Sequence, residues 1–125
     1  MNPKKIRAVS EMKAAERYDY FIRKVCDFEM VWGLYDGGWA TGVVESKSVI
    51  PVWPEEEFAA ISCGGTWSGY SPKAIPLGDF KDRWIPGATA DGKLFAIFPT
   101  QSDKASTVEG SRLLSDIDAE SKSYE

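Results

Sequence analysis

The chain has 125 residues, of which 43% are hydrophobic and 27% charged, with a formal net charge of -4 at pH 7. This length suits one domain, and the combination of ample apolar content with low net charge excludes an intrinsically disordered chain. No apolar run reaches the roughly 20 residues of a membrane span, and no apolar segment of a secretory signal follows the basic start. We therefore expect a cytoplasmic protein with a single domain over residues 1–125, of which residues 1–9 form a flexible end.

Histidine is absent from the sequence. Its absence excludes Ser-His-Asp and Cys-His catalysis, histidine metal ligands and histidine pH switches. The two cysteines, Cys26 and Cys63, cannot form the usual structural zinc site without histidine. The excess of acidic residues argues against binding to a phosphate backbone. We predict no metal, no cofactor, no nucleic acid and no membrane partner.

The first half of the chain predicts one helix and three strands. Apolar residues every three or four positions indicate an amphipathic helix from about Ser10 to about Phe28, with Ser10 as its N-cap and Arg17 among the charged residues of its solvated face. The turn signal at 36–38 predicts a hairpin between strands over 30–35 and 39–44. Residues 49–53 predict a third strand. Pro51 within it indicates a sheet edge, because proline cannot donate to a ladder.

The second half predicts shorter elements. A short helix begins at Pro54–Glu57 and ends at Gly64-Gly65, and the Gly-, Ser- and Pro-rich stretch 64–76 is expected to be a loop. The remaining predictions are a short helix from Leu77 stopped by Pro86-Gly87, an apolar strand over 94–98, a polar connection over 101–105 and a last helix starting at the capping box Ser106–Glu109.

The resulting order is α-β-β-β-α-α-β-α. The simplest architecture for it is α+β, a mainly antiparallel sheet of about four strands with flanking helices.

A series of aromatic, proline and glycine landmarks resembles an uncharacterised bacterial family, domain of unknown function 2750. The resemblance extends from about Tyr18 to Thr100. It implies a small, single-domain, cytoplasmic bacterial protein and supplies no catalytic residue. The family landmark Asp-Gly-Trp-Ala has one glycine, whereas this chain has two. The landmarks are Trp32-x-Leu34, Asp36-Gly37-Gly38-Trp39-Ala40, Pro51-Val52-Trp53-Pro54, Trp67, Tyr70-x-Pro72, Trp84-x-Pro86-Gly87, Asp91-Gly92 and Phe98-Pro99-Thr100.

Five tryptophans are many for so short a chain. Trp32, Trp53 and Trp84 stand at apolar-pattern positions and are interpreted as core. Trp39 beside a turn and Trp67 in a loop fit the core less well, so we consider them, with Tyr70, as a candidate binding surface. Core packing remains the alternative for this pair of tryptophans.

The first functional hypothesis is a non-enzymatic protein-interaction module, with an immunity or accessory protein facing a basic toxin as a specific version. The partner could also be a second copy, joined through an edge strand at 49–53. An alternative is a small enzyme without histidine, which would bring together two or more of Asp36, Asp79, Asp82, Asp91 and Glu57. Another alternative is a small-molecule sensor with a closed aromatic cavity.

Overall fold

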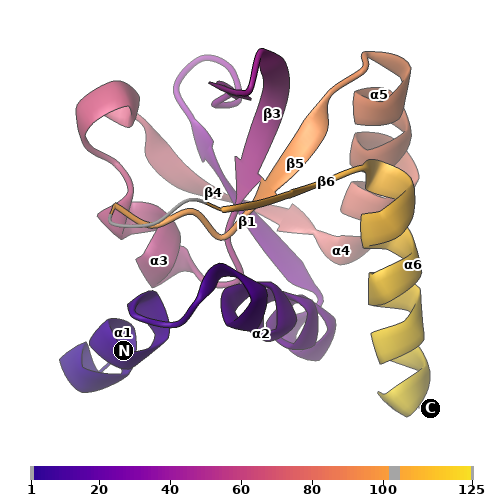
Figure 1. Ribbon diagram of the computed structural model, residues 1–125, viewed down its shortest axis with the longest axis horizontal. Coiled ribbons are helices and arrows are strands. Elements are labelled where there is room, and N and C mark those ends of the chain that lie inside the picture. The colour runs from indigo at the N-terminus through magenta and orange to yellow at the C-terminus, as the bar shows by residue number, and fades with distance from the viewer. Residues whose placement is uncertain (1, 102–104, 125) are drawn as a thin grey trace.

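Two β-sheets form the centre of the computed structural model, which describes residues 2–101 and 105–124 (Figure 1). One sheet has two antiparallel strands, and the other has four strands in the order β2-β3-β5-β6, with β3 and β5 parallel and the other pairs antiparallel. The strands are β1 (Met30–Tyr35), β2 (Gly42–Val44), β3 (Lys47–Val52), β4 (Ser71–Pro76), β5 (Leu94–Ile97) and β6 (Ser106–Val108), with β1 and β4 forming the two-stranded sheet.

A pair of tryptophans joins the two sheets. Trp32 in β1 and Trp53 just after β3 form an antiparallel bridge, in which each backbone N–H donates to the other residue's carbonyl at 2.9 and 2.8 Å. The side chain of Trp53 is fully buried. The end of β3 is therefore tied both to its own sheet and to β1.

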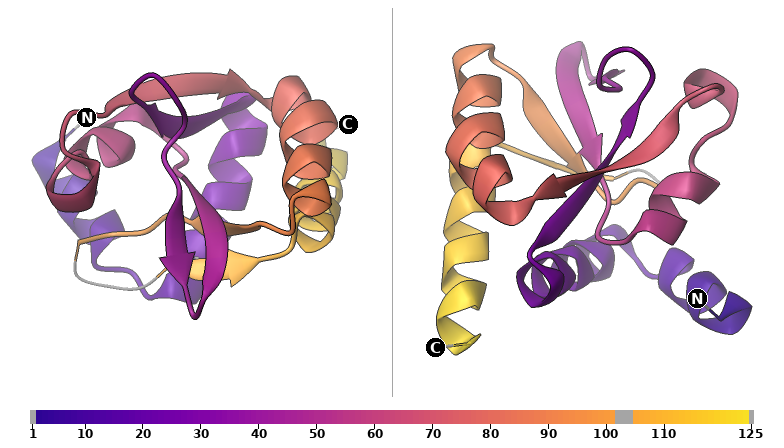
Figure 2. Two further views of the ribbon diagram at one scale, coloured as in Figure 1. Left: turned by 90° about the horizontal axis from the view of Figure 1, so that it is seen from above. Right: turned by 180° about the vertical axis from the view of Figure 1, so that it is seen from behind.

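Helices α2, α5 and α6 pack against the two sheets. In Figures 1 and 2, α2 crosses below the strands, while α5 and α6 lie side by side at the edge of β5 and β6. The helical elements are α1 (Pro3–Ser10), α2 (Ala14–Phe28), α3 (Glu56–Ile61), η1 (Gly65–Trp67), α4 (Leu77–Asp79), η2 (Phe80–Trp84), α5 (Ile85–Ala90), α6 (Gly110–Ser121) and η3 (Lys122–Tyr124). No helix among the described residues is both long and apolar enough to cross a membrane.

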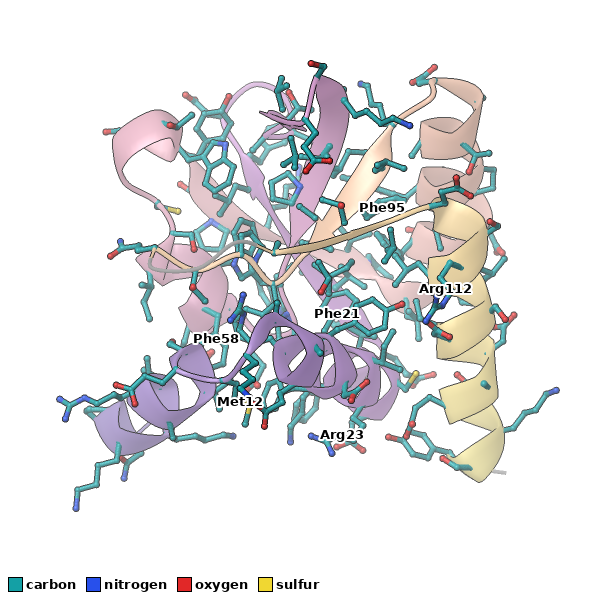
Figure 3. The ribbon with its side chains drawn as sticks, in the orientation of Figure 1. Met12, Phe21, Arg23, Phe58, Phe95 and Arg112 are labelled. Carbon is teal, nitrogen blue, oxygen red and sulfur yellow. The ribbon has the colours of Figure 1, made fainter. Side chains whose placement is uncertain are left out.

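The main core lies between α2, the strands and α6. Phe21 on α2 and Phe95 on β5 are both completely buried and point into this space (Figure 3). Burying such a side chain contributes about 1.5–3 kcal/mol relative to leaving it exposed. The other fully buried apolar side chains in this core include Val25, Val31, Val52, Phe80, Ile97, Leu113 and Ile117.

The α+β class is confirmed, but β3 is not an edge strand. It lies between β2 and β5, so the predicted edge at 49–53 and the homodimer through it are wrong. Pro51 is tolerated inside the sheet because of where its nitrogen points. It points to the side of β3 on which Val49 pairs with β2 and Trp53 pairs with β1, and it lies between these two pairings. The ladder between β2 and β3 ends at Val49 and the bridge to β1 begins only at Trp53, so the missing N–H of Pro51 removes no hydrogen bond from either pairing.

The predicted hairpin and loop are also rearranged. The segment expected to return along β1 meets it only at the Tyr35–Trp39 bridge, and its strand, β2, pairs with β3 instead. The predicted loop over 64–76 contains a strand, because β4 pairs with β1 along its whole length. The described residues therefore form six strands, more than the about four that the sequence predicts.

The helix boundaries differ at three places. The predicted helix over 10–28 begins later, as α2 at Ala14. Most of the segment expected as a flexible end forms a separate helix, α1, which Asn2 caps and the turn at 11–13 separates from α2. The helical segment from Leu77 passes Pro86 and ends at Ala90, since the wider π-helical turn η2 stands just before the proline and accommodates it. Residues 106–108 form β6 instead of a helix start. Of the predicted polar connection over 101–105, residues 102–104 lie outside the described residues.

Close packing of α6 against α5 requires a glycine. Gly110, the first residue of α6, is buried, and a Cβ there would lie 2.9 Å from both Ile85 Cγ2 and Thr89 Oγ1. The Thr89 hydroxyl is held by a bond to the Ile85 carbonyl, so it cannot easily move away. In contrast, a Cβ on Gly87 of α5 meets nothing within 4 Å.

Gly110→Ala is expected to destabilise the protein by about 1–3 kcal/mol, because the added methyl group overpacks the α5–α6 contact. Gly87→Ala is the matched control and should be neutral or stabilising by up to about 1 kcal/mol, since alanine favours the helix. Urea denaturation measures both. Equal stability of the two variants would contradict the close approach.

Candidate functional site

The candidate site is a groove beside β2. Two adjoining hollows, of about 330 and about 490 Å³, share four lining residues: Gly42, Val43, Trp67 and Pro99. We name them together the Trp67 groove. One hollow extends toward the chain at 62–66, and the other extends over the outer face of the four-stranded sheet to Pro51 and Ala96.

The strand along this groove has a free edge. β2 stands first in its sheet and, among the strands of the described residues, pairs with β3 alone, in a hairpin that projects from the molecule (Figure 2). Its two-residue turn, Glu45-Ser46, has φ values of 51° and 68°, as a tight hairpin turn requires. The turn is closed by Val44 and Lys47, so these two residues exchange hydrogen bonds and the next pair, Val43 and Ser48, does not.

Val43 therefore directs its backbone N–H and C=O away from β3, toward the free edge. Its side chain is 73% exposed, and that of Val44 is 37% exposed. No described residue hydrogen bonds to the backbone of Val43. An exposed apolar residue with unpaired backbone groups on an edge strand is a template for pairing with another chain.

The opposite wall is the chain that follows β5. Phe98 has a φ of 56°, unusual for a bulky residue, and its N–H donates to the Val52 carbonyl at 2.8 Å. Its carbonyl accepts from Arg17 Nε at 3.0 Å, and the carbonyl of the next residue, Pro99, accepts from Trp53 Nε1 at 2.9 Å. These bonds place Pro99 in the groove wall.

Arg17 contradicts its predicted place on a solvated helix face. It is completely buried, and its Nη1 also donates to the carbonyl of Met12, at the turn between α1 and α2 (Figure 3), at 2.6 Å. The helix pattern could not show this, because one of the two carbonyls belongs to residue 98, far along the chain.

The three predicted surface aromatics lie in different surroundings. Trp67 lines the groove, and its ring meets Trp53 edge-on with centroids 5.8 Å apart. Trp39 instead packs between Tyr35 and Trp84, at centroid distances of 5.1 and 4.5 Å. Tyr70 is half-buried against the core. Trp39 and Trp67 thus belong to two separate aromatic clusters.

Val43, Val44 and Pro99 are site residues that sequence reasoning missed. The sequence predicts the two valines in a strand that returns along β1, whereas β2 pairs with β3 and stands at the edge of that sheet. Pro99 had a local signal, as the end of an apolar strand, but its place opposite β2 depends on the distant Arg17 and Trp53.

The alternative carboxylate site finds little geometric support. None of Asp36, Asp79, Asp82, Asp91 and Glu57 lines either hollow of the Trp67 groove. In the part of the chain that the structure describes, no three Cys, Asp or Glu side chains lie close enough to hold a metal ion. Cys26 and Cys63 are free thiols, and burial raises the pKa of each.

A second, more polar hollow of about 750 Å³ lies between α2 and α6. Asp116 Oδ2 accepts from Tyr18 Oη at 2.5 Å and from Arg112 Nε at 3.0 Å. Burial, followed by this bond to Asp116, raises the pKa of Tyr18. Arg112 on α6 and Arg23 on α2 stand on its two walls (Figure 3), but Asp19, Asp116 and Glu120 offset their charge.

The comparisons with known proteins identify the family. The model of the family described as "Protein of unknown function (DUF2750)" matches residues 18–117. The chain belongs to this family. The matched segment of this DUF2750 protein contains every residue that lines the Trp67 groove. No curated protein matches the chain.

Tyr20 gives this DUF2750 protein a testable pH dependence. Its hydroxyl donates to Glu55 Oε1 at the start of α3, and burial, followed by that bond, raises its pKa above the ordinary value of 10.0. The folded state therefore keeps a proton that an unfolded tyrosine loses near pH 10.0. The stability from this proton is fully present below that pH and is lost as the pH rises further.

Urea denaturation at several pH values from about 8 to about 11 tests this effect. The free energy of unfolding of the wild type should fall relative to that of Tyr20→Phe as the pH rises above the ordinary tyrosine pKa. A difference between the two proteins that stays constant over this range would contradict the raised pKa of Tyr20.

Proposed function

We propose that this chain is a protein-interaction module that binds an extended, apolar segment of a protein partner along β2, in the Trp67 groove. The observation that carries the proposal is the free edge at Val43, a residue that lines the same groove as Trp67 and Pro99. In this binding mode the main chain supplies hydrogen bonds, while hollows for side chains supply specificity.

The lining of the groove favours an apolar segment. Val43, Val44, Pro51, Trp67 and Pro99 offer carbon atoms to a ligand, and exposed apolar surface of this kind marks interaction sites. Glu45 is the one charged side chain among the described lining residues. A basic residue of the ligand near the hairpin tip would pair with Glu45. The rest of the described groove lining carries no charge, so it gives no support to the strongly basic partner of the immunity-protein hypothesis.

A proline at position 43 tests the edge directly. Val43→Pro removes the outward N–H and leaves the bonds between β2 and β3 in place, and proline is tolerated on edge strands. The preceding residue, Gly42, accepts the restriction that a proline imposes. Val43→Ala is the matched control, because it shortens the side chain and keeps the N–H.

We expect a random-peptide display library to yield apolar peptides that bind the wild type. Val43→Pro should weaken them at least about tenfold, because one backbone hydrogen bond is lost and the ring obstructs the strand, whereas Val43→Ala should weaken them less. Isothermal titration measures the affinities, and thermal melting verifies that both variants fold.

Three results would overturn the proposal. The first is a library that enriches no peptide, and the second is a set of selected peptides that bind Val43→Pro as tightly as the wild type. The third is sedimentation that shows a dimer of the wild type which Val43→Pro dissociates, because the edge would then belong to a second copy of the chain.

A further inference from the structure

We infer that the indole N–H of Trp67 is a second hydrogen-bond donor for the bound segment. Among the described residues of the free protein this N–H has no acceptor. After the ring shifts, it pairs with a backbone carbonyl of the ligand. This inference rests on the proposed function, and it assigns to Trp67 a role beyond apolar contact. It also gives the chemistry of the ligand, an extended peptide main chain rather than an apolar side chain alone.

The two neighbouring tryptophans differ in their hydrogen bonding. Trp53 Nε1 donates to the Pro99 carbonyl at 2.9 Å. Trp67 Nε1 is buried and has no hydrogen-bond partner among the described residues. Leaving a buried donor unpaired is costly, and such groups are rare enough in native proteins that each one calls for an explanation.

The indole N–H of Trp67 lies on the side of the ring that faces β2. A Cβ on Gly42 would be 4.0 Å from Trp67 Cζ2, and Cζ2 and Nε1 are both bonded to the same ring atom, Cε2. Gly42 therefore leaves space for this edge of the indole, and Val43, with its outward-facing backbone, is the next residue of β2. One extended segment along β2 can reach both donors.

A shift of the ring is required, because the nitrogen is closed off from solvent in the free protein. Trp67 ends the short turn η1, which begins at Gly65 and is followed by Gly69; these two glycines have φ values of 54° and 88°. The turn is held by local bonds, from Trp67 N to the Gly64 carbonyl and from Tyr70 N to the Trp67 carbonyl. It can move as a unit without breaking any strand pairing.

Replacement of Trp67 by 3-benzothienylalanine tests the donor, because sulfur takes the place of the N–H and the ring keeps its shape. In the free protein this replacement should raise the folding equilibrium constant several-fold, since it removes an unpaired buried donor. The same replacement at Trp53 is the matched control. It should lower the folding constant, because it removes the bond to Pro99.

The peptide selected on the wild type provides the second measurement. Its affinity should fall about tenfold when Trp67 carries the benzothienyl ring, although the free protein becomes more stable. A loss of folding stability at Trp67 would overturn the inference, because the N–H would then have a partner in the free protein. Unchanged affinity would also overturn it. If Val43→Pro still weakened binding as expected, the proposed function would stand without the second donor.

Discussion

The buried guanidinium of Arg17 is the interaction on which the arrangement around the groove depends. A charged group in the core is tolerated only when its donors are satisfied. Arg17 reaches the carbonyls of Met12 and Phe98, and so ties the turn before α2 to the chain that leaves β5. It holds Phe98 in a backbone conformation that a bulky residue rarely adopts. The path of Pro99, and with it one wall of the groove, follows from this contact.

The wall formed by β2 depends on how β3 divides its pairing among three strands. Within seven residues β3 and Trp53 pair with β2, β5 and β1, and the short interval at Pro51 separates two of these pairings. Because the ladder between β2 and β3 stops at the pair Gly42–Val49, where this interval begins, β2 is short, and its outer side borders the groove. The free edge and the Trp67 ring that rests beside it are therefore consequences of the same pairing pattern.

Local patterns in the sequence were sufficient for much of the fold. The apolar spacing of α2, the run of β1 and the apolar strand β5 were predicted because each carries its signal within a few residues. β4 was missed because Ser71–Pro76 holds two prolines and a single buried residue, Ile75, and becomes a strand only through pairing with the distant β1. Trp67 was selected from its position in a loop, whereas the role of Val43 depends on which strand β2 pairs with. Arg17 could not be identified, since its partners lie outside the helix pattern.

Backbone amide hydrogen exchange in the free protein tests the central claim, a free edge at Val43, most directly. In dilute solution, the amide of Val43 should exchange nearly as fast as that of an unstructured residue. The amides of Gly42 and Val44, which face β3, should be protected. Protection of Val43 equal to that of Val44 would show that its N–H is already bonded in the free protein, and would contradict the edge on which the proposed function is built.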